Sequence, residues 1–152
     1  MSLQKKMFLK SKLKQQPGLI VNSTGDILGR HQGLAFYTLG QRKGLGGGFK
    51  EPLFVIGSNR EKNELIIGPE RKLYKDELLL EKISWVSGHK PKLPLACRAR
   101  IRYQAEETAC HLDGRNKQMV VQLKKAQRAI TPGQSVVFYK GKVVLGGGII
   151  ER

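Results

Sequence analysis

The sequence predicts a mainly β protein: a small domain with short strands, followed by a six-stranded antiparallel β-barrel. Three observations support this fold class. The second half contains evenly spaced short apolar runs separated by turn signals. Two apolar runs in the first half are joined by a charged turn, and no helix of ordinary length is apparent in the second half. The 152 residues suit one ordinary domain or two small ones.

The N-terminal segment, residues 1–16, is basic. Residues 4–14 place a few apolar side chains among lysines, which favours one or two turns of amphipathic helix. Pro17 and Gly18 would end such a helix. No long apolar stretch follows, so we do not expect a secretory signal.

Residues 17–75 are predicted to form the first domain. Its expected elements are a strand at 19–21, a second strand starting at 27–28, a strand or short helix at 35–39, a loop at 41–48, and a β-hairpin of 53–60 with 63–68. A polar stretch follows this hairpin, and we place the domain boundary there, near residues 72–79.

Residues 76–152 are predicted to form the barrel. Its expected strands are 78–86, 96–104, 108–113, 117–123, 134–140 and 142–150. Three consecutive glycines interrupt the last run. They indicate a bulge or a sharp bend of the barrel rather than chemistry.

The charge is strongly positive, with 28 Lys and Arg against 12 acidic residues and a net charge of +16. Residues 1–50 and 91–152 each carry an excess of eight basic residues, whereas residues 51–90 are neutral. Such an excess attracts polyanions, of which nucleic acid is the commonest, although a merely solvated surface is the alternative. No apolar run approaches the roughly 20 residues that span a bilayer. We expect neither a membrane nor DNA as a partner.

The sequence offers few candidates for catalytic or metal-binding residues. Cys97 and Cys110 belong to no CxxC motif and lie in apolar strand contexts, where thiols are usually inert. His31, His89 and His111 are scattered, and no nucleophile–base order is apparent. We therefore expect no metal site, no catalytic residue, and free thiols in a reducing cytoplasm.

The run ACRARIRYQ alternates strictly, which places Arg98, Arg100 and Arg102 on one strand face. Guanidinium groups about 6.6 Å apart match a phosphate backbone. The alternative is a solvated face with acidic cross-strand partners, for which this half offers only Glu106, Glu107, Asp113 and Glu151. Tyr103 follows, and it would either stack on a base or pack on the barrel.

Two further segments carry candidate contacts. In the turn TPGQ, the Gln134 amide both donates and accepts, as recognition of a base or ribose requires, but the signal is weak. In HQGLAFYTLGQRKGLGGG, the polar side chains allow a phosphate or RNA contact, and the glycines let a backbone approach closely. Alternatively, Thr38 and Gln41 satisfy backbone groups and the glycine-rich tail is mobile. The candidates in this stretch are His31, Gln41, Arg42 and Lys43.

Four segments together resemble the tRNA-specific 2-thiouridylase family. They are GRHQGLAFYTLGQRKGLGGG, the tail IRYQ, TPGQSVVFYKG and LGGGIIER. The resemblance runs from about residue 8 to residue 152, in the family's order. It implies the family's small central domain and its C-terminal barrel, which is similar to domain two of translation elongation factors.

The resemblance also implies a function. The family thiolates the wobble uridine of certain tRNAs, using ATP and a cysteine persulfide. The family's nucleotide-binding motif SGGxDS and its two catalytic cysteines are absent, so this chain is expected to hold no cofactor and to be inactive by itself. The family's tRNA contacts match Arg102, Tyr103 and Gln134, and the GQRKG segment is expected to help position tRNA. A barrel that binds a sulfur-carrier protein is the alternative.

Overall fold

The structure is a computed structural model that describes residues 16–151. The predicted N-terminal helix lies outside these residues. The chain divides into two compact units, the first ending at Leu73 and the second beginning at Tyr74. Within residues 16–151, no helix is long and apolar enough to cross a membrane.

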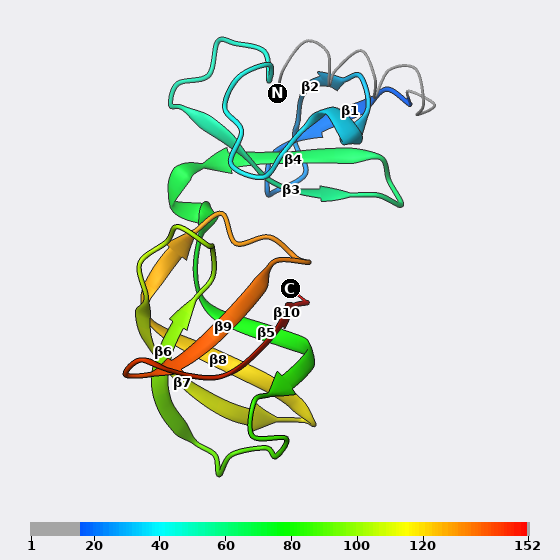
Figure 1. Cartoon of the computed structure of the whole chain (residues 1–152). Helices are drawn as coiled ribbons and strands as arrows, with labels where there is room; N and C mark the ends of the chain where they lie inside the picture. Colours follow the sequence, from blue (N-terminus) through cyan, green and yellow to red (C-terminus); the bar gives the residue numbers. More distant parts are fainter. Residues whose placement is uncertain (1–15, 152) are drawn as a thin grey trace. The chain divides into compact units, whose positions relative to one another are not determined.

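The first unit contains a four-stranded sheet with the order β2-β1-β4-β3 (Figure 1). Its strands are β1 (Gly18–Val21), β2 (Ile27–His31), β3 (Leu53–Asn59) and β4 (Glu64–Pro69). β1 and β4 are parallel, and the other two pairs are antiparallel. The predicted β-hairpin is therefore confirmed as β3 and β4. Ile20, Leu65 and Ile67 form the centre of its core.

Between β2 and β3 the chain forms a short 3-10 helix, η1 (Leu34–Phe36), and then a loop. This loop is fastened to β3, because Gly40 N–H donates to Val55 O and Val55 N–H donates to Gln41 O, both at 2.8 Å. Leu45 is buried in the core of the sheet. The glycine-rich stretch is thus anchored in its middle. A second 3-10 helix, η2 (Glu70–Leu73), ends the unit.

The second unit is a closed six-stranded barrel with the order β10-β5-β8-β7-β6-β9, drawn from green to red in Figure 1. Every neighbouring pair is antiparallel, as predicted. Leu78, Leu112, Val121 and Phe138 are fully buried in its centre. The strands are β5 (Tyr74–Trp85), β6 (Leu95–Arg100), β7 (Thr108–Arg115), β8 (Gln118–Arg128), β9 (Ser135–Lys140) and β10 (Val143–Ile150).

The three glycines of β10 lie where the strand register shifts against both neighbours, which confirms the predicted bulge. A Cβ atom at Gly146 would collide with the backbone of Ser84 on β5, and one at Gly147 would collide with Val136 O on β9. Gly146 also has a φ of +156°. Glycine is required here because two neighbouring backbones approach β10 closely.

One predicted strand ends earlier than expected. β6 stops at Arg100, so Arg102 and Tyr103 lie in a turn beyond the strand and not on its outer face. Ala105 N–H donates to Arg102 O at 2.9 Å and closes this turn. The expectation of three arginines in one row along a strand was therefore wrong for Arg102.

Candidate nucleic-acid interface

The turn after β6 presents an aromatic side chain to solvent. Tyr103 is 93% exposed. Beside it in the sequence, Arg102 donates from Nη2 to Arg128 O at 2.9 Å and to Ala129 O at 2.8 Å. These bonds join the turn to the end of β8. They hold the guanidinium in place with neutral acceptors and leave its charge uncompensated.

The TPGQ turn, residues 131–134, comes shortly after Arg128 and Ala129, whose carbonyls hold Arg102. Thr131 Oγ1 donates to Ala129 O at 3.2 Å, so Ala129 O accepts from both Arg102 and Thr131. Gln134 Oε1 accepts from Thr131 N–H at 3.1 Å, which shapes the turn that leads into β9. The amide oxygen of Gln134 is therefore used within the fold. The structure brings Arg102, Tyr103 and the TPGQ turn together at neighbouring loops of the barrel.

Arg98 and Arg100 share one carboxylate. Arg98 Nε lies 3.3 Å from Glu107 Oε2, and Arg100 Nη2 lies 3.0 Å from Glu107 Oε1. Arg98 Nη2 also donates to Glu107 O at 2.8 Å. The Arg100 guanidinium carbon lies 5.4 Å from the centre of the Tyr139 ring. The acidic partner that we considered as an alternative is thus present, but one carboxylate balances only one of these two positive charges.

His31 is buried with 1% exposure, and both ring nitrogens are used inside the first unit. Gly33 N–H donates to Nδ1 at 3.0 Å, and Nε2 lies 3.0 Å from Asn63 O. Because a backbone N–H only donates and a carbonyl only accepts, these contacts fit the tautomer with its proton on Nε2. This arrangement gives His31 a structural role that ties β2 to the turn between β3 and β4.

Gln41 organises its own loop. Its Oε1 accepts from Thr38 N–H at 3.1 Å, and its Nε2 donates to Lys43 O at 2.8 Å. Gln41 therefore satisfies backbone groups of its own loop, which is the alternative that we considered for this residue. Arg42 and Lys43 follow with exposed side chains.

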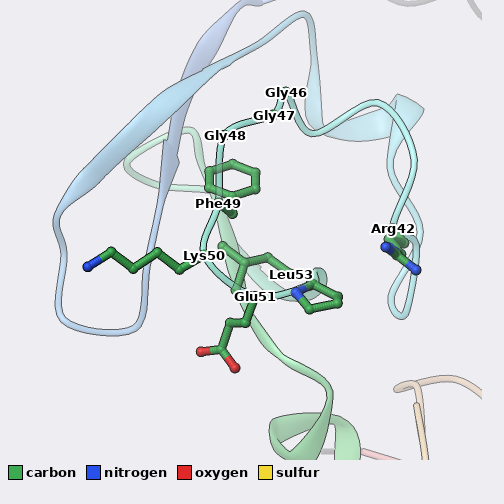
Figure 2. Close-up of a pocket in the computed structure, with 9 residues that line it drawn as sticks. Arg42, Gly46, Gly47, Gly48, Phe49, Lys50, Glu51 and Leu53 are labelled. Carbon is green, nitrogen blue, oxygen red and sulfur yellow. The ribbon is translucent and has the colours of Figure 1, made fainter.

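A pocket of about 370 Å³ lies beside this loop. Its lining residues are Arg42 and Gly46 through Leu53. Figure 2 shows the charged ends of Arg42 and Lys50 on opposite sides of the Gly46–Leu53 segment. Glu51 lies 3.7 Å from Arg71. The pocket therefore lacks a pair of cations that converge on one point, and the turn after β6 is the better candidate for an anion contact.

Two contributors to the candidate interface were missed by the sequence reasoning. The backbone carbonyls of Arg128 and Ala129 hold Arg102, and backbone acceptors leave no signal in side-chain patterns. Glu107 was noted only as an available acid. Its position directly before β7, the strand paired with β6, was the signal that it would face the arginines. Among residues 16–151, no three His, Cys, Asp or Glu side chains gather as metal ligands.

Two protein families match this chain. Residues 75–150 match the family described as "aminomethyltransferase beta-barrel domain", which coincides with the barrel unit. Residues 6–69 match the family described as "tRNA methyl transferase PRC-barrel domain". Each match thus falls on one side of the division at Leu73 and Tyr74.

Curated proteins that are similar to this chain share one name. The tRNA-specific 2-thiouridylase MnmA of Halothermothrix orenii is 48% identical over 138 residues, covering 90% of this chain and 38% of the relative. The MnmA of Ruthia magnifica is 50% identical over 152 residues, covering 95% of this chain and 42% of the relative. The chain spans about two fifths of the length of these relatives. The glycine-rich loop and the barrel therefore belong to a member of the tRNA-specific 2-thiouridylase family.

Proposed function

We propose that the barrel unit of this chain binds tRNA, as the RNA-binding part of an enzyme that thiolates the wobble uridine of tRNA. One observation carries this proposal. A 93% exposed tyrosine, Tyr103, adjoins Arg102, whose guanidinium is fixed by backbone carbonyls and forms no ion pair within residues 16–151. An exposed aromatic ring beside a fixed cation suits a stacked base and its phosphate.

The charge supports the same proposal. The net charge of +16 supplies the sequence-independent attraction to a phosphate backbone. Arg98 and Arg100 retain a net positive charge after Glu107 is counted. The relatives are named for a tRNA substrate, and that name supports tRNA as the polyanion.

We also propose that this chain contributes binding and not the chemistry. ATP and the persulfide sulfur would react at the wobble uridine, bound and positioned by other residues of the whole enzyme. The sequence contains no SGGxDS motif to hold the nucleotide. Incubation of the chain with ATP, a sulfur donor and tRNA is expected to yield no 2-thiouridine by mass spectrometry of the digested RNA. We place the protein in the cytoplasm, where its tRNA substrate would be.

The binding proposal is tested by fluorescence anisotropy with labelled tRNA at several salt concentrations. We expect log affinity to fall linearly and steeply with log salt, because bound phosphates release counterions. Tyr103→Ala is expected to weaken binding roughly tenfold, since stacking contributes about 1 to 3 kcal/mol per base. The side chain is almost fully exposed, so its loss should leave the fold unchanged.

Val86→Ala is the matched control, because Val86 is an exposed apolar side chain of the same unit at 73% exposure. It should bind tRNA as the unmodified chain does. Equal affinities of Tyr103→Ala and Val86→Ala would contradict the proposed interface. Absent tRNA binding together with co-purification of a sulfur-carrier protein would instead favour the alternative of a protein-interaction barrel.

A further inference from the structure

Two cysteines face each other across β6 and β7. Cys97 and Cys110 are directly opposite in the antiparallel register, and their Sγ atoms are 3.5 Å apart. Both side chains belong to the barrel interior, where Cys110 is buried in the core and Cys97 packs against its edge. Both are free thiols. Neither contributes to the interface proposed above.

We propose that Cys97 and Cys110 form a redox modification site, at which hydrogen peroxide or an organic hydroperoxide converts the two thiols into a reversible cross-strand disulfide.

The backbone geometry permits this bond. Opposite residues of an antiparallel pair have Cα atoms about 4.5 or 5.5 Å apart, depending on the hydrogen-bonding position. Disulfides span Cα separations of about 4.4 to 6.8 Å, so either kind of pair fits. The sulfur atoms must approach from 3.5 Å to bonding distance. Rotation about the two Cα–Cβ bonds, with a small approach of the strands, provides this movement.

The two thiols differ in a way that assigns them separate roles. Cys97 is half-buried, whereas Cys110 is 2% exposed, so an oxidant reaches Cys97 first. A hydrogen bond from Cys110 lowers the pKa of Cys97. The same hydrogen bond, together with burial, raises the pKa of Cys110. Cys97 is therefore the attacking thiolate and Cys110 is the thiol that resolves the intermediate.

The reaction balances with peroxide as the oxidant. The Cys97 thiolate attacks one peroxide oxygen, the O–O bond breaks, and hydroxide leaves, which produces a sulfenic acid at Cys97. The Cys110 sulfur then attacks the Cys97 sulfur and displaces hydroxide, which takes the Cys110 proton and leaves as water. Each cysteine loses one electron, and the peroxide is reduced to two waters. A dithiol reductant reverses the change by thiol–disulfide exchange.

The disulfide would close a loop around the turn that carries Tyr103. Residues 97–110 form the covalent ring, and the turn at 102–105 lies within it. Closing this loop reduces the conformational freedom of the unfolded chain. The oxidised protein is therefore expected to unfold at a temperature several degrees above that of the reduced protein.

The experiment uses the full chain, reduced, desalted and treated with hydrogen peroxide at low molar excess. Intact-mass spectrometry should show the loss of two hydrogens, and peptide mapping should link the fragments that contain Cys97 and Cys110. Dithiothreitol should restore the original mass. These measurements need no variant. An unchanged mass with both thiols open to alkylation after denaturation would overturn the proposal, as would intermolecular dimers or irreversible oxidation of Cys97 without a linked Cys110.

Two variants separate the roles. Cys110→Ala removes the resolving thiol, so a sulfenic acid should accumulate at Cys97 and react with dimedone. Cys97→Ser should leave the Cys110 thiol unoxidised at the same peroxide dose. Far-UV circular dichroism verifies that each variant folds. A folded Cys110→Ala protein that gives no dimedone adduct would contradict the assignment of Cys97 as the attacking group.

Discussion

At the scale of single residues, the three arginines near β6 differ in what binds their guanidinium groups. Arg98 and Arg100 share the Glu107 carboxylate, with side chains 50% and 37% exposed. Arg102 instead donates to two backbone carbonyls. The Glu107 carboxylate lowers the positive charge around Arg98 and Arg100. The backbone carbonyls orient the Arg102 guanidinium and leave its charge as it is. In the proposed tRNA-binding role, the contribution of Arg98 and Arg100 therefore depends on Glu107.

This dependence gives a prediction for Glu107→Gln. Loss of the carboxylate frees both guanidinium groups for phosphates, so the slope of log affinity against log salt should become steeper by up to about one unit. The measurement is the salt titration with labelled tRNA. Glu106→Gln is the matched control, because it removes the same charge from the neighbouring exposed position. Identical slopes for the two variants would show that Glu107 does not restrain the arginines from RNA.

At the scale of elements, the sequence of β10 is tightly constrained by its two neighbouring strands. Its glycines lie where β5 and β9 come closest. Any side chain at Gly147 would meet the carbonyl oxygen of Val136. The barrel closes through this contact, so it tolerates no added atom there.

We therefore predict that Gly147→Ala destabilises the barrel by about 1 to 3 kcal/mol, the usual cost of overpacking a well-packed site. Urea unfolding followed by Trp85 fluorescence measures this loss. Gly114→Ala is the matched control in the same barrel, because a Cβ atom built there would meet only the Leu93 side chain, at an ordinary contact distance of 3.7 Å. A barrel that unfolds at the same urea concentration in both variants would contradict the close approach of β10.

The strands of both units followed from local patterns, whereas the end of β6 and the pairing of β1 with β4 did not. Alternating apolar residues and turn dipeptides predicted the six barrel strands and the hairpin of β3 and β4. The end of β6 was misplaced because alternation continues through Arg102 while the guanidinium bonds back to the end of β8. The parallel pairing of β1 with β4 was also beyond local patterns, since it joins segments more than 40 residues apart.

The candidate site residues likewise depend on features of the folded backbone that local sequence patterns do not predict. The sequence left open whether Tyr103 packs on the barrel or stacks on a base, and its 93% exposure in the turn after β6 excludes only the packing. The roles of His31 and Gln41 depend on backbone acceptors and donors several residues or a whole hairpin away. Such partners are set by the folded backbone and have no side-chain signature.

At the scale of the whole molecule, each unit has a core of its own. The core of the first unit includes Ile20 and Leu65, and that of the barrel includes Leu78 and Phe138. The single Trp of the chain, Trp85, stacks against Phe138 with ring centres 6.3 Å apart. Tryptophan fluorescence therefore reports on the barrel alone, and circular dichroism reports on both units.

This separation predicts the outcome of His31→Ala. The variant leaves the buried Gly33 N–H and Asn63 O without their partner, which is expected to destabilise the first unit by about 2 to 4 kcal/mol. The circular dichroism transition in urea should shift to lower concentration or split, while the Trp85 fluorescence midpoint stays unchanged. A fluorescence midpoint that shifts equally would mean that the two units unfold as one.

The way Arg102 is held has a consequence for kinetics. Acceptors without net charge leave the electric field of the guanidinium intact, so it extends into solvent over roughly a Debye length, about 8 Å at physiological ionic strength. A field of this kind guides a diffusing polyanion before any contact forms. Arg102 would thus govern how fast an encounter with RNA occurs, and the neighbouring ring of Tyr103 would govern how long the complex lasts.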